Sequence, residues 1–131
     1  ANLNMLDFET YFKIITALLE EDIPETLLQL NEIINKGFDA GQFLTGLGDH
    51  FRTLLVAKDT KTIPMMEVAA QTQQKFKAQS EAFAYEHLVT ALQLVNDASY
   101  NYKNSPNKRL HTEVCLMQLA SLKEAEKKKA K

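Results

Sequence analysis

Two residues of the sequence, His111 and Cys115, have the types and the spacing of a base and a nucleophile. They stand four positions apart, so on a helix the imidazole and the thiol would share one face. A thiol becomes reactive beside cationic or basic groups, whereas the segment around Cys115 is mostly apolar. We therefore interpret Cys115 as a packed core thiol and predict no catalytic pair here.

Metal and phosphate chemistry also lack their usual patterns. Zinc sites need closely spaced histidines and cysteines, but His50, His87 and His111 fall on three separate predicted helices and Cys115 is the only cysteine. The chain has four glycines and none of the glycine-rich motifs that cradle phosphates. The sequence thus predicts no metal and no cofactor in this chain.

Paired carboxylates occur at Glu20 with Glu21 and at Glu124 with Glu126. Both pairs are predicted at helix ends, where water would solvate them, so we expect no general acid–base catalysis there. Glu113 differs, because it lies in the most apolar predicted helix, four residues after Arg109. Two interpretations of that pair stay open: an ion pair within the chain, or a contact with another subunit.

The composition is typical of one ordinary globular domain. The chain has 131 residues, 45% of them hydrophobic and 24% charged, and a formal net charge of -2. No apolar run approaches the roughly 20 residues that span a bilayer, and a single cysteine fits a reducing compartment. We expect a cytoplasmic protein with no membrane contact.

Nucleic-acid binding is not indicated either. With a net charge of -2 the chain has no overall attraction for a phosphate backbone. A helix-turn-helix would need donor side chains at the start of its second helix, which here opens with Asp39, Ala40, Gly41 and Gln42. The local basic cluster, Lys103, Lys108, Arg109 and His111, is interpreted as a solvated turn, so no sequence-specific contact with DNA is expected.

Apolar residues recur with the helical period along most of the chain. A first helix, capped by Asp7, would bury Phe8, Phe12, Ile15 and Leu19. Later helices would begin at capping patterns or prolines and end at breakers; their expected starts are Asp22, Asp39, Pro64 and Ser105, and their expected ends include Gly37, about Lys58 and about Asn104. Residues 71–90 could form one kinked helix or two.

Three of these helices have distinctive compositions. The third predicted helix contains Gly41, Gly46 and Gly48, and we favour close approach of a neighbouring helix over a flexible joint as the reason. The last helix is apolar on nearly every side and should be buried all round, either inside the bundle or against another chain. The helix after Pro64 is mostly polar and should lie on the outside.

These patterns predict an all-α fold, a single bundle of five to six helices over residues 1–122. Residues 123–131, KEAEKKKAK, would form a charged tail or linker. No strand pattern with turn chemistry and no internal repeat is present.

Two short elements carry a resemblance to a known family. The run Asn101 to Leu110, NYKNSPNKRL, contains an S-x-N-x-R-L element, and His50 to Leu55 form an H-F-R-x-L-L element. Their order and separation, within the segment that begins YFKIITALLEEDIPETLLQL, resemble the third domain, the collar, of the gamma/tau subunit of the bacterial DNA polymerase III clamp loader. The likeness covers nearly the whole chain.

The resemblance implies an oligomerisation domain that holds a clamp-loader pentamer together during DNA replication. Its partners would be other gamma/tau copies and the delta and delta-prime subunits, and ATP hydrolysis would belong to domains outside this chain. The residues we expect at a subunit interface are Phe51, Arg52, Asn107, Arg109 and Glu113. The alternative is a generic helical adaptor domain that docks a peptide in a groove.

Overall fold

The structure, a computed structural model, describes residues 6–122. These residues form helices and connecting segments with no β-strand, which confirms the all-α bundle and the upper end of the expected helix number. The elements are α1 (Phe8–Leu19), α2 (Ile23–Asn35), α3 (Ala40–Ala57), the 3-10 turn η1 (Ile63–Met65), α4 (Ala70–Glu81), α5 (Tyr85–Asn101), the 3-10 turn η2 (Tyr102–Asn104) and α6 (Lys108–Ala120).

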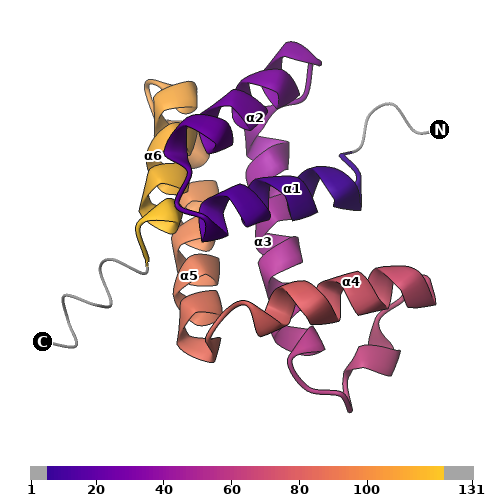
Figure 1. The fold of residues 1–131 in the computed structure, drawn as a ribbon. Helices are drawn as coiled ribbons and strands as arrows, with labels where there is room; N and C mark the ends of the chain where they lie inside the picture. The colour runs from indigo at the N-terminus through magenta and orange to yellow at the C-terminus, as the bar shows by residue number, and fades with distance from the viewer. Residues whose placement is uncertain (1–5, 123–131) are drawn as a thin grey trace, which may run out of the picture.

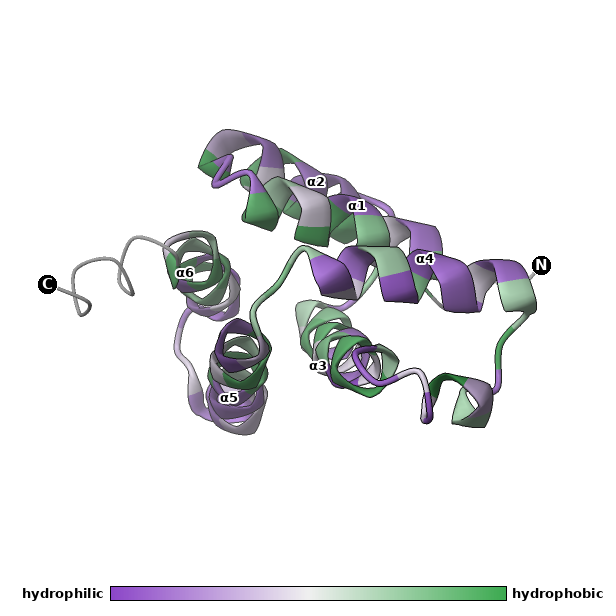
Figure 2. Cartoon of the chain, turned by 60° about the horizontal axis from the view of Figure 1, so that its bottom comes forward, coloured by the Kyte–Doolittle hydropathy of each residue, from purple (hydrophilic) through white to green (hydrophobic). Residues whose placement is uncertain are grey.

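The helices lie in two layers. Figure 1 shows α1 and α4 crossing in front of α3, with α5 and α6 beside α3. In Figure 2, α3, α5 and α6 are seen nearly end-on, while α1, α2 and α4 lie across them. The longest helix, α3, packs chiefly against α5 and α4 and forms the spine of the core.

The first three helices begin where the sequence predicts, because each start is fixed by a local hydrogen bond. The carboxylates of Asp7, Asp22 and Asp39 accept from the backbone N–H groups of Thr10, Glu25 and Gln42 at 2.9, 3.1 and 3.1 Å. Gly37, with φ +93°, follows α2 as expected of a residue in the left-handed region.

The predicted start of the last helix is wrong by two residues. Ser105 is not its N-cap; Asn107 is, and its Oδ1 accepts from the backbone N–H of Leu110 at 3.0 Å. The hydroxyl of Ser105 instead donates to the carbonyl of Asn107 at 3.2 Å. Ser105 and Pro106 therefore belong to the turn that leads into the cap.

Replacing Asn107 by alanine should lower the free energy of unfolding by about 1 kcal/mol, because the first turn of α6 loses the side chain that accepts its N–H. Ser105→Ala is the matched control and should change it by less than about 0.5 kcal/mol. Urea denaturation of both variants measures the difference. A larger loss for Ser105→Ala would restore Ser105 as the cap.

The predicted helix start at Pro64 is also wrong. Pro64 lies in η1, a single 3-10 turn, and α4 begins only at Ala70. The side-chain amide of Gln73 donates to the carbonyls of Met66 and Val68 at 3.2 and 3.3 Å, which holds the extended segment between them. Residues 71–90 form two helices, separated by a break at residues 82–84.

The first helix buries part of the predicted face and extends it around the helix: Ile15 is in the core and Phe12 packs against the core. Its buried apolar residues are Tyr11, Ile14, Ile15, Ala17 and Leu18, whereas Phe8 is 47% exposed. Phe8 and Phe12 face α4, where their rings lie 5.5 and 4.8 Å from the ring of Phe76. The helix therefore carries two adjacent apolar faces, one on the core and one under α4.

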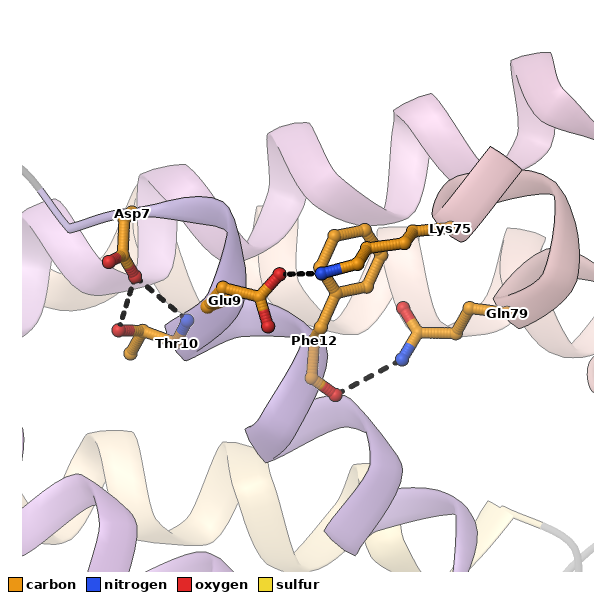
Figure 3. A network of polar contacts seen from close by, with 6 residues as sticks. All are labelled: Asp7, Glu9, Thr10, Phe12, Lys75 and Gln79. Carbon is orange, nitrogen blue, oxygen red and sulfur yellow. Dashed lines mark hydrogen bonds and ion pairs between the residues drawn. The ribbon is translucent and has the colours of Figure 1, made fainter. Parts of the chain in front are cut away.

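α4 lies on the outside, as its composition predicts, and polar side chains help to hold it (Figure 3). Lys75 forms an ion pair with Glu9 of α1. The amide nitrogen of Gln79 donates to the carbonyl of Phe12 at 3.1 Å, and the Gln79 Oε1 lies 2.8 Å from Nε2 of His50 in α3. One glutamine thus joins three helices.

Close packing explains two of the three glycines of α3. A Cβ on Gly46 would lie 2.0 Å from the hydroxyl oxygen of Tyr11, and one on Gly41 would lie 2.8 Å from Cε2 of Tyr102. At Gly48 the nearest atom would be Cγ1 of Val95, at an ordinary 3.5 Å. The interpretation of close approach is confirmed at Gly41 and Gly46, but it does not account for Gly48.

Candidate subunit interface

α6 presents two apolar faces that point in opposite directions. One face is buried in the bundle and consists of Thr112, Cys115, Leu116, Leu119 and Ala120. On the opposite face Leu110, Val114 and Met117 are 51%, 43% and 36% exposed. Their spacing of four and three residues places them along one line on the helix surface. We call these three residues the outer stripe.

The outer stripe excludes one of the two predicted ways in which the last helix could be buried all round, burial inside the bundle; burial against another chain stays a prediction. Within residues 6–122 the helix is buried on its inner side only, where it packs against α1, α2, α3 and α5. Contact with four helices fixes the orientation of α6. The apolar side chains of the outer stripe therefore stay directed outward, as expected of a surface that a partner covers.

The pair Arg109 and Glu113 lies beside the outer stripe and connects α6 to α2. The guanidinium of Arg109 donates to Oδ1 of Asn31 at 2.8 Å and, through Nε, to Oε2 of Glu113 at 3.4 Å. The structure thus contains the ion pair within the chain. Both side chains are partly exposed, 48% and 23%, so they can also contact a protein that covers the outer stripe.

The junction between α5 and α6 is anchored on the start of α3. The hydroxyl of Tyr102 donates to Oδ1 of Asp39, the N-cap of α3, at 3.3 Å. The ammonium of Lys108 lies 5.7 Å from the centre of the Tyr102 ring, and the ring of His111 lies 6.3 Å from it. This cluster fixes where α6 begins and so positions the outer stripe.

The five residues predicted at an interface fall in two places. Asn107, Arg109 and Glu113 lie together on α6, where Asn107 is the N-cap. Arg52 is exposed on α3, but Phe51 is 1% exposed and packs edge-on against Phe83, with ring centres 6.0 Å apart. Phe51 therefore presents no side chain at the surface. The outer stripe was not among the predicted residues. In the sequence, however, the helical period already places its three positions on the side of the helix opposite the buried positions.

Cys115 and His111, the residues with the spacing of a catalytic pair, both make contacts within the chain. Burial raises the pKa of the Cys115 thiol to about 12, so it stays protonated near neutral pH. Nε2 of His111 lies 2.8 Å from the carbonyl oxygen of Ala98, to which it donates. These contacts support the interpretation of Cys115 as a core thiol.

Two further observations concern the described part of the chain only. Residues 6–122 contain no group of three metal-ligating side chains placed to hold an ion. No helix among them combines the length and the apolar character that crossing a membrane requires.

Comparisons with known proteins agree with the fold and the sequence elements. Residues 3–131 match the family model described as DNA polymerase III subunits gamma and tau domain III. Among solved structures, the Bacillus subtilis DNA clamp loader delta protein (YqeN) superposes with a TM-score of 0.76 over 86% of this chain, at 17% sequence identity. The match spans 36% of that delta protein, and at this identity it shows the fold alone. No curated protein matches the chain significantly in sequence.

Proposed function

Because the chain belongs to the family of domain III of the DNA polymerase III gamma and tau subunits, we propose that it is the collar through which such a subunit joins its neighbours in a clamp loader. The observation that carries this proposal is the outer stripe. A helix fixed on four neighbours, with three apolar side chains directed away from them, fits a surface that another subunit covers.

The chemistry around the outer stripe supports a protein partner. Apolar side chains form the centre of a typical subunit interface, and polar or charged groups form its rim. Here Leu110, Val114 and Met117 would be the centre, while Arg109 and Glu113 would lie at the rim. Because Arg109 and Glu113 already pair with each other, covering them leaves no isolated charge.

The partners we propose are other gamma/tau copies and the delta and delta-prime subunits, arranged in a ring of five. In a ring each subunit uses one surface toward the next subunit and a different surface toward the previous one. The outer stripe would be one of these two surfaces. ATP hydrolysis would take place in other domains of the parent protein, which we expect in the cytoplasm, and this domain would have no catalytic role.

Val114→Glu tests the role of the outer stripe. The variant should raise the dissociation constant of the full subunit from its ring neighbours by at least about 10-fold, because a carboxylate at the centre of an apolar interface loses its water without gaining a partner. Analytical ultracentrifugation of the full-length subunit mixed with delta and delta-prime measures the assembly. Since Val114 is exposed, the unfolding temperature of the domain should stay the same.

Met65→Glu is the matched control, because Met65 is 74% exposed and lies in the connector before α4 rather than on α6. It should assemble like the parent chain. Unchanged assembly of Val114→Glu would contradict the proposed surface. Loss of assembly by both variants equally would favour a general effect of added charge.

A further inference from the structure

A second feature of the surface, separate from α6, is a cavity of about 360 Å³ between α3 and the start of α1. Its walls are partly aromatic and include Phe8, Phe38 and Phe76. Its polar side follows one face of α3, where Thr45, Asp49, His50 and Thr53 line it. None of the residues of the proposed collar surface takes part.

The two threonines of the cavity offer hydrogen-bond acceptors. The hydroxyl of Thr45 donates to the carbonyl of Gly41 at 3.1 Å, and that of Thr53 donates to the carbonyl of Asp49 at 2.8 Å. Each hydroxyl has one proton, and each proton is used within α3. The two hydroxyl oxygens can therefore only accept hydrogen bonds from a ligand.

His50 adds no positive charge to the cavity wall. The amide nitrogen of Gln79 donates to the carbonyl of Phe12, so its Oε1 must accept from the histidine, and the proton of His50 lies on Nε2. Nδ1 is then unprotonated; it has no hydrogen-bond partner among residues 6–122, but it is buried and is not presented to the cavity. His50 is 3% exposed, and its burial lowers its pKa to about 4, so the ring is neutral at pH 7.

The cavity is also lined by the carboxylate of Asp49 and by the phenol of Tyr11, whose hydroxyl proton already forms a hydrogen bond. The hydroxyl of Tyr11 donates to the carbonyl of Phe43 at 3.2 Å. Burial, and after it the charge of Asp49, raises the Tyr11 pKa to about 12, so the phenol stays neutral. The exposed carboxylate of Asp49 adds further acceptors, and of the lining side chains only the amide of Gln42 can serve as either donor or acceptor.

We propose that this cavity binds the guanidinium group of an arginine side chain from a protein partner. A guanidinium carries five N–H donors, no acceptor and a permanent positive charge, which matches walls that offer acceptors and one carboxylate. Its flat faces stack on aromatic rings, and the ring of Phe8, which lines the cavity and is 47% exposed, offers such a surface. A lysine ammonium is more strongly hydrated and has no flat face, so it fits less well.

The test uses the 131-residue chain, labelled with ¹⁵N, and the blocked amino acid N-acetyl-arginine-N-methylamide as the probe. Titration should shift the amide signals of residues 42–53, with a dissociation constant on the order of 1 mM for so small a ligand. The citrulline analogue, which has the same shape without the charge, should bind at least about 10-fold more weakly. The lysine analogue should fall between the two.

Asp49→Asn should weaken binding of the arginine probe by about 5-fold to 10-fold. Asp59→Asn removes the same charge from the exposed connector after α3 and should leave binding unchanged. The proposal is overturned if the arginine probe causes no shifts, if citrulline or lysine binds as well as arginine, or if Asp49→Asn binds like the parent chain.

Discussion

Phe51→Ala is expected to lower the free energy of unfolding by about 3–5 kcal/mol, among the largest losses that one substitution in this chain should cause. The ring of Phe51 is 1% exposed and lies against Phe83, so its removal leaves a cavity in the core around α3. Domains of this size are stable by about 5–15 kcal/mol, so the variant should unfold at much lower urea concentrations. Urea denaturation followed by circular dichroism measures the loss.

Arg52→Ala is the matched control, because Arg52 is the next residue on the same helix and is exposed. It should change the free energy of unfolding by less than about 0.5 kcal/mol. Comparing the two variants distinguishes a role of Phe51 in the core from a role at a subunit interface. If Phe51→Ala were as stable as the parent chain but impaired in assembly, its place in the core would be contradicted and the expected interface role supported.

Gly46→Ala is expected to lower the free energy of unfolding by about 2–3 kcal/mol, although alanine is the better helix former. The new Cβ would lie 2.0 Å from the hydroxyl oxygen and 2.5 Å from Cζ of Tyr11. Tyr11 cannot move freely, because its ring stacks on Phe43 with centres 5.7 Å apart and its hydroxyl donates to the Phe43 carbonyl. Thermal unfolding by calorimetry measures the change.

Gly48→Ala should act in the opposite direction and raise the free energy of unfolding by about 0.5–1 kcal/mol. It lies two residues further along α3, and its Cβ would meet only Cγ1 of Val95 at 3.5 Å. Opposite signs at the two glycines would confirm that close contact, and not the helix itself, requires Gly46. Equal stabilisation by both substitutions would show that Tyr11 can move aside at little cost.

The helix starts that were predicted correctly depend on short-range contacts. Asp7, Asp22 and Asp39 each cap a backbone N–H three residues later, so the information lies within one turn of the sequence. The start of α6 was missed for a related reason: Ser105 and Asn107 are both good caps, and the sequence alone does not choose between them.

Two of the remaining differences depend on contacts between distant segments. α1 has enough apolar residues for two faces, and only the position of α4 over Phe8 and Phe12 shows which face enters the core. Likewise the apolar character of α6 predicts burial, but the division into an inner face and the outer stripe needs the surrounding helices. The segment before α4, by contrast, is held by nearby contacts, the hydrogen bonds from the Gln73 side chain to carbonyls five and seven residues earlier.

The way α4 is attached has a consequence for how the domain opens. α4 packs chiefly against α3, and among its side chains only Phe76 and Ser80 are buried, whereas α6 packs against four helices. Segments with few buried contacts exchange their amide hydrogens through local unfolding that leaves the rest of a protein intact. α4 would therefore be the earliest helix to detach. Because Phe76 is one wall of the arginine cavity, that cavity would vanish in the detached state, and a bound arginine would slow hydrogen exchange in α4 while leaving α6 unaffected.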